Sequence, residues 1–195
     1  MPWPTAIDRI LALMLGMTMA ISGLCEENAK SDEPTPQRGA YAATQCREAP
    51  QCPLFDEVYA ATPAFRHALA LSLRHGDEQV PDWIKDKLPG GRSVSKTPAL
   101  GTASPMLPVS IDDRPYILGR MTDPQSSMDT VVALYDTHRG ISTVYFISKH
   151  GQPKLLGDET AILQKVIKDY VNTDSDFARA LARPDLALPI PVSSR

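Results

Sequence analysis

The chain has 195 residues, of which 43% are hydrophobic and 22% charged, and its formal net charge is −3 at pH 7. This length suits one folded domain, which buries roughly 70% of the surface of its unfolded chain. The near balance of charge, with no long block of one sign, argues against nucleic acid or an anionic surface as partner.

The N-terminal residues 1–24 are predicted to be a signal peptide. Ile10–Leu24 is almost wholly apolar, follows the single basic residue Arg9, and is short for a membrane span. Either cleavage after Ala20 or lipid attachment at Cys25 would follow. The residues before Cys25 fit a lipidation signal poorly, so we expect a soluble periplasmic protein ahead of a membrane-anchored lipoprotein. An uncleaved anchor helix is the third alternative.

Two cysteines indicate an exported protein. A disulfide between Cys46 and Cys52 would close a small loop and contribute about 2 kcal/mol, and only an oxidising compartment would keep it. Two reduced thiols are the alternative, and Cys25 is left without a partner. The pair has no nearby histidine or second cysteine pair, so it makes a poor zinc site, and we expect neither a metal nor another cofactor.

The segment 25–53 is rich in Pro, Ser, Ala and charged residues and has little to bury, which predicts a flexible tether. The folded domain is therefore predicted over 54–183, with a Pro-containing tail over 184–195. Within the domain, Thr62 and Pro63 favour the start of a helix that ends near His75. A short helical turn is predicted in PDWIKDKL, from Pro81.

Four strands follow as two predicted hairpins. PMLPVSI and PYILGRM are joined by Asp112-Asp113-Arg114, and Pro108 and Pro115 suggest edge positions because each removes a ladder donor. TVVALYD and ISTVYFISK are joined by Thr137–Gly140 and are rich in β-branched and aromatic residues, which favours strands.

A short strand, KLL, precedes an amphipathic helix predicted in DETAILQKVIKDYV from Asp158, and DSDFARALAR adds a last helical turn. Helices at the two ends of an antiparallel meander predict an α+β domain. We expect a central antiparallel sheet of about five strands with helices packed on one side.

Residues that carry chemistry are sparse. The histidines have no partner at metal-binding or catalytic spacing, and Asp112-Asp113 suits a turn better than an acid–base pair. There is no G-x-S-x-G motif and no Gly-rich phosphate loop. The sequence therefore favours a protein that is not an enzyme. The histidines are His67, His75, His138 and His150.

Several segments between Ala64 and Val171 follow one another in a recognisable order. They are PAFRHAL, VPDWIKDKL, PVSIDDRPYILGRM, DTVVALYD and GISTVYFIS, followed by the C-terminal helix. This order resembles the Ivy family of periplasmic inhibitors of vertebrate lysozyme. In that family a helix with AAF precedes an LPxWV segment, matched here by Val80–Ile84, and a strand with a tyrosine, matched by Tyr116, enters an exposed loop.

The resemblance implies an Ivy-like sheet packed against helices, no catalysis, often a homodimer, and a muramidase as target. The family's loop carries C-K-P-H-D-C, whose histidine reaches the catalytic carboxylates of the target and whose cysteines clamp the loop. Laid on this chain without a gap, the motif falls on Met121–Ser126, so both cysteines and the histidine are missing. The predicted partner-binding loop consists of Met121, Thr122, Asp123, Pro124, Gln125, Ser126, Ser127 and Met128.

Two functions are consistent with these features. The first is a periplasmic binding or inhibitor protein of the cell envelope that blocks a muramidase, either a host lysozyme or a competitor's toxin. Inhibition of C-type lysozyme is not expected, because Asp123 would repel two catalytic carboxylates unless one is protonated. The second is a non-inhibitory structural or accessory module of the envelope that keeps the fold, and the missing loop motif favours it.

Overall fold

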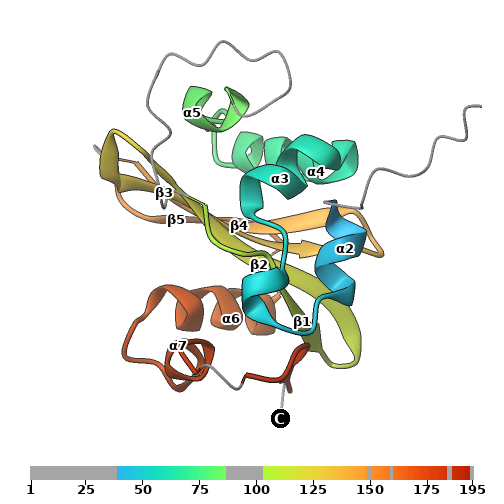
Figure 1. The fold of residues 1–195 in the computed structure, drawn as a ribbon. Helices are drawn as coiled ribbons and strands as arrows, with labels where there is room; N and C mark the ends of the chain where they lie inside the picture. Colours follow the sequence, from blue (N-terminus) through green and yellow to red (C-terminus); the bar gives the residue numbers. More distant parts are fainter. Residues whose placement is uncertain (1–38, 87–102, 149–150, 159, 184–185, 194–195) are drawn as a thin grey trace, which may run out of the picture. The chain divides into compact units, whose positions relative to one another are not determined.

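The computed structural model describes residues 39–86, 103–148, 151–158, 160–183 and 186–193, all within one unit, Pro36–Arg195 (Figure 1). The predicted signal peptide, Cys25 and the first part of the predicted tether lie outside the described residues. The same is true of His150 and of the predicted end of the short helix.

The fold is built on a six-stranded sheet in the order β5-β4-β3-β2-β1-β6. Neighbours from β1 to β5 pair antiparallel, and β6 pairs parallel with β1. The predicted α+β class and its antiparallel meander are confirmed, and β6 extends the sheet by one strand. The strands are β1 Leu107–Ile111, β2 Arg114–Asp123, β3 Ser126–Asp136, β4 Ile141–Ile147, β5 Lys154–Gly157 and β6 Ile190–Val192.

Alternate residues of the central strand β3 pack into two apolar layers on opposite faces. Val131, Ala133 and Tyr135 belong to one layer, and Val132 and Leu134 belong to the other. This is the period-two alternation of a strand buried on both sides. The sheet is therefore the centre of the core, with helices covering each face, whereas helices on one side were predicted.

The first layer is closed by helices from the N-terminal half, which lie together on one side of the sheet in Figure 1. Phe65, Leu69 and Leu73 of α4 and Ile84 of α5 are fully buried there, and Trp83 packs beside them half-buried. The α4 helix has the predicted bounds, with Pro63 in its first turn and Gly76 after its end. These helices are α2 Ala40–Gln45, α3 Phe55–Ala61, α4 Pro63–His75 and α5 Asp82–Lys85.

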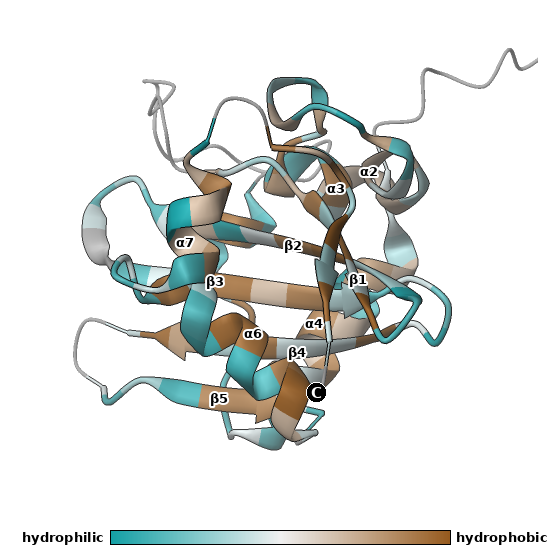
Figure 2. Ribbon diagram, turned by 90° about the horizontal axis from the view of Figure 1, so that it is seen from below, coloured by the Kyte–Doolittle hydropathy of each residue, from teal (hydrophilic) through white to brown (hydrophobic). Residues whose placement is uncertain are grey.

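The second layer is covered by α6 Ala161–Val171 and α7 Asp176–Leu181, which cross the apolar face of the sheet in Figure 2. Leu163, Val166 and Ile167 of α6 are buried against the strands, as the predicted amphipathic pattern requires. The α7 helix has a side-chain cap, because Ser175 Oγ accepts the Ala178 N–H at 2.9 Å.

Both predicted hairpins are confirmed, and their turns have the backbone that tight turns need. Asp112 and Asp113 alone connect β1 to β2, with φ of 46° and 64°. Gly140 has φ of 68° and ends the β3–β4 turn, where a residue with positive φ was expected.

The prediction that Pro108 and Pro115 mark edge strands is wrong, because β1 and β2 lie inside the sheet. Each proline escapes one ladder instead. The β6 pairing with β1 begins at Val109, after Pro108, and the β3 pairing with β2 begins at Tyr116, after Pro115. A missing N–H is tolerated at such positions.

Two predicted linkers are parts of the fold. In the predicted tether, the described residues 39–53 include α2 and a 3-10 turn, Ala49–Gln51, with Ala43 and Cys52 buried. In the predicted tail, β6 joins the sheet and Ile190 is buried. The folded domain therefore begins before Leu54 and extends beyond residue 183.

The helix α6 begins at Ala161, not at Asp158 as predicted. Asp158 instead accepts the hydroxyl and the N–H of Thr160, and its Oδ2 lies 3.3 Å from the Arg139 guanidinium. The Thr160 hydroxyl contributes most to holding the pKa of the Asp158 carboxyl below its ordinary value of 3.8, although burial opposes the shift.

A lowered folded-state pKa gives stability that is fully present above the unfolded pKa and lost as the pH falls through the folded pKa. We expect Thr160→Val to raise the Asp158 pKa and to reduce this stabilisation. Carboxyl-carbon NMR titration measures the shift. Thr160→Ser keeps the hydroxyl and should leave the pKa low, and an unchanged pKa in Thr160→Val would contradict the assignment.

Candidate functional site

The predicted partner-binding loop is mostly strand and forms the end of the β2–β3 hairpin. Asp123 ends β2 and Ser126 begins β3, so only Pro124 and Gln125 connect them. The register shifts here: Asp123 pairs with Ser126, whereas Thr122 pairs with Thr130. The β3 residues between these pairs have no described partner on β2 and form a bulge.

Side-chain hydrogen bonds hold this end of the hairpin. The Gln125 N–H donates to Asp123 Oδ1 at 2.8 Å, which closes a turn of the kind that Asp side chains favour. The Thr122 and Thr130 hydroxyls lie 3.2 Å apart across the two strands. The turn is therefore ordered without a disulfide.

The same residues extend past the neighbouring strands. The last described pair of β3 with β4 is Thr130–Ile147, and the last pair of β2 with β1 is Leu118–Leu107. The residues 122–129, which we call the tip, thus continue beyond the paired ends of both neighbours apart from an isolated bridge at Met121. The tip is formed where β2 ends and β3 begins, and these are the two longest described strands.

The structure divides the predicted loop residues into two groups. Gln125 is exposed, and Thr122, Asp123, Pro124 and Ser126 are partly exposed. The inclusion of Met121 is wrong, because its side chain is completely buried in the first apolar layer and cannot reach a partner. The side chains of Ser127 and Met128 lie outside what the structure describes.

The tip carries an acidic residue that the sequence analysis did not include. Asp129 lies directly after Met128, and its Oδ1 is buried with no hydrogen-bond partner among the described residues. Together with Asp123 it gives the tip two carboxylates.

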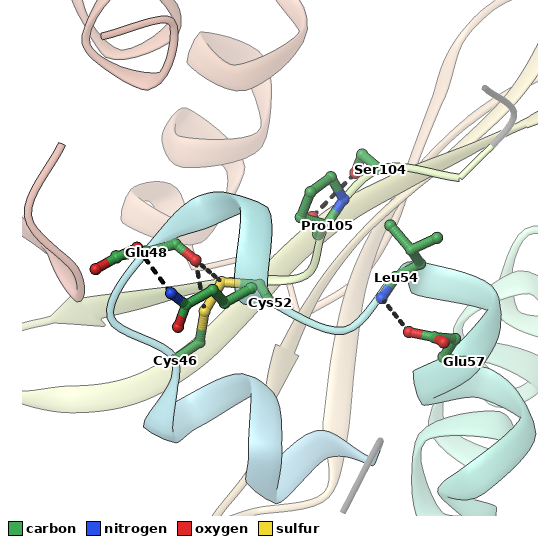
Figure 3. Close-up of a disulfide and its surroundings, with 8 residues drawn as sticks. Cys46, Glu48, Cys52, Leu54, Glu57, Ser104 and Pro105 are labelled. Carbon is green, nitrogen blue, oxygen red and sulfur yellow. Dashed lines mark hydrogen bonds between the residues drawn. A yellow bond between two sulfur atoms is a disulfide. The ribbon is translucent and has the colours of Figure 1, made fainter. Parts of the chain in front are cut away.

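The disulfide prediction is confirmed: Cys46 and Cys52 are bonded and buried in the second apolar layer (Figure 3). The following segment turns toward the first layer, where Phe55 packs. Two backbone hydrogen bonds, each 2.9 Å, join it to the segment directly before β1. The Phe55 N–H donates to the Ser104 carbonyl, and the Met106 N–H donates to the Pro53 carbonyl.

Replacing both cysteines with serine is expected to lower the free energy of unfolding by about 2 kcal/mol, because a short loop is released in the unfolded chain. Urea unfolding of the Cys46→Ser/Cys52→Ser variant beside the oxidised wild type measures this. Reduced wild type should match the variant. Equal midpoints for all three proteins would show that the disulfide contributes no stability.

The three histidines that the structure describes do not gather into a site. His67, His75 and His138 are all exposed, on α4 and in the β3–β4 turn. Over the described ranges, no group of three or more His, Cys, Asp or Glu side chains is placed to hold a metal ion. In the same part of the chain, no helix is long and apolar enough to cross a membrane.

Comparisons with known proteins add no assignment. No family model, curated protein or solved structure matches this chain.

Proposed function

We propose that this protein is a periplasmic, Ivy-like binding protein that blocks a peptidoglycan-degrading muramidase with the β2–β3 tip. The observation that carries the proposal is the tip itself, which is ordered and projects past its neighbouring strands. The disulfide supports export, since reducing compartments do not preserve such bonds. The target is either a host lysozyme or a competitor's muramidase toxin.

The order of the tip matters for binding because it lowers the entropic cost of docking. A flexible loop loses about 1 kcal/mol or more for each residue that it orders on a partner. Here the connection is two residues long, and Asp123 already fixes the Gln125 amide. The hairpin therefore supplies the rigidity that cysteines supply in the family motif.

The polar groups of the tip fit a muramidase cleft in a different way from a histidine. Such a cleft holds one protonated and one ionised carboxyl group. The Asp123 carboxylate can accept a hydrogen bond from the protonated acid. The side-chain amide of the exposed Gln125 can donate a hydrogen bond to the ionised carboxylate. This pairing avoids the repulsion that Asp123 would cause against two ionised groups.

The proposal is tested with the mature protein, from Glu26, against C-type, G-type and I-type lysozymes and purified muramidase toxins. Lysis rates and equilibrium dissociation constants are measured for wild type, for Pro124→Ala/Gln125→Ala, and for Lys168→Ala on the exposed face of α6 as the matched control. We expect inhibition of at least one enzyme, weakened about tenfold or more by the tip variant and unchanged by the control.

Absence of binding and inhibition across the whole panel would contradict the proposal. Equal inhibition by wild type and tip variant would contradict the role of the tip. The first result is the one expected of a non-inhibitory accessory module of the envelope.

A further inference from the structure

The end of the sheet opposite the tip contains a cavity of about 400 Å³. The β1–β2 and β3–β4 turns meet at this end, because Tyr116 pairs with Asp136 at the start of β2 and the end of β3. Its size falls in the range of about 300–1,000 Å³ typical of small-molecule pockets. The lining residues are Arg114, Pro115, Asp136, His138 and Arg139.

Asp136 is the buried acceptor in this lining, with only 3% of its surface exposed. Its Oδ1 accepts the N–H groups of His138 at 2.9 Å and Arg139 at 2.8 Å, which fixes the carboxylate against the turn. Its Oδ2 is buried and has no hydrogen-bond partner among the described residues. Such an oxygen is costly to bury unless a donor reaches it.

Two arginines line the same cavity. Arg114 is exposed, and its side chain has no hydrogen-bond or ion-pair partner among the described residues. Arg139 contacts Asp158 at 3.3 Å with one nitrogen and keeps its other donors. The lining thus presents a carboxylate acceptor beside two groups that bind carboxylates in a forked geometry.

This arrangement selects among ligand classes. A metal cation would meet two arginines and a single carboxylate, and a phosphate or sulfate would be repelled by Asp136. A ligand that carries a positive donor and a carboxylate close together can pair with both Asp136 and the two arginines. Pro115 adds an apolar wall for a side chain.

We propose that this cavity binds the zwitterionic head of an α-amino acid. The ammonium group donates to Asp136 Oδ2, and the carboxylate accepts from Arg114 and Arg139. The head group comes either from a free amino acid or from a cell-wall peptide that ends in a free ammonium and carboxylate on one carbon. The inference is independent of the muramidase proposal, since the cavity and the tip lie at opposite ends of β2 and β3.

The test is an amide NMR titration of the full mature protein with L- and D-amino acids and, separately, with a synthetic stem peptide that carries the free zwitterionic end. N-acetylated and amidated forms of the same compounds remove one charge each. We expect saturable shifts at the amides of residues 136–139 with at least one zwitterion, and none with either blocked form. The two arms show whether the free compound or the peptide is preferred.

Two variants assign the contacts. Asp136→Asn keeps an oxygen for the turn amides but replaces the acceptor for the ammonium, and Arg114→Gln removes an exposed guanidinium without affecting the core. Each should weaken binding about tenfold or more, whereas Arg47→Gln, an exposed arginine outside the cavity, should have no effect.

Four outcomes would overturn the inference. Three are no saturable shift with any zwitterion, equal binding of the blocked forms, and binding that persists unchanged in both Asp136→Asn and Arg114→Gln. Shifts with acetate or phosphate alone of the same size as those with amino acids would likewise reduce the site to non-selective charge attraction.

Discussion

Replacing Phe65 with alanine is expected to lower the free energy of unfolding by about 3–5 kcal/mol. The Phe65 side chain is completely buried on α4 and contacts rings from a helix and from the sheet. Its centroid lies 5.4 Å from that of Phe55 and 5.1 Å from that of Tyr135. The variant loses both the apolar burial and these aromatic contacts. The substitution therefore weakens the packing of α4 against both α3 and β3.

Urea unfolding followed by circular dichroism measures the change. Leu71→Ala on the same helix is the matched control, since Leu71 is 38% exposed and should cost much less. If the two variants lost the same stability, the packing of α4 on the sheet would differ from that described.

Gly157→Ala is the second substitution with a large expected effect, a loss of about 3–5 kcal/mol or failure to fold. Gly157 ends β5 with φ of 96°, and an added Cβ would clash with the Ser142 carbonyl oxygen. That oxygen also accepts the buried Ser72 hydroxyl at 2.6 Å, so the clash would disturb the contact between α4 and β4.

Gly140→Ala separates strain from crowding. Gly140 has φ of 68°, but the nearest atom to an added Cβ, Tyr135 Oη, is 4.0 Å away. Only the backbone cost of about 1–2 kcal/mol is expected there. Thermal unfolding of both variants gives the comparison, and a Gly140 variant less stable than the Gly157 variant would be inconsistent with the close approach at Ser142.

Most of the fold could be predicted from local pattern. Pro63 and Gly76 bound α4, and the alternation in TVVALYD and ISTVYFISK gives β3 and β4, because each signal is carried by residues adjacent in sequence. The α+β class follows from the order of these elements.

The missed elements have weak or misleading local signals. The α2 helix buries only small side chains, Ala40 and Ala43, so a segment rich in alanine and charge resembled a linker. Pro191 made β6 look like tail, yet an edge strand tolerates a proline. Both elements depend on contacts with strands that lie far away in the sequence.

The predicted partner-binding loop lies at the β2–β3 connection, but the connection is shorter than predicted. Ile117 and Met121 share one face of β2 by the period-two rule, which would have identified Met121 as core. The two-residue turn and the bulge could not be read from MTDPQSSM, since its small polar residues suit a longer loop equally well.

Asp136 shows the same limit. It continues the inward alternation of Val132 and Leu134, so its burial follows from the strand pattern. Its proximity to Arg114 depends on the register in which β2 pairs with β3. The sequence alone does not specify that register residue by residue.

The measurement that tests the central proposal most directly is hydrogen–deuterium exchange of the mature protein mixed with each muramidase of the panel. If the tip binds the enzyme, exchange should slow at the backbone amides of Asp123, Gln125 and Ser126, and the exchange of the α6 amides should not change. Protection confined to another surface, or no protection with any muramidase, would contradict a tip that binds such an enzyme.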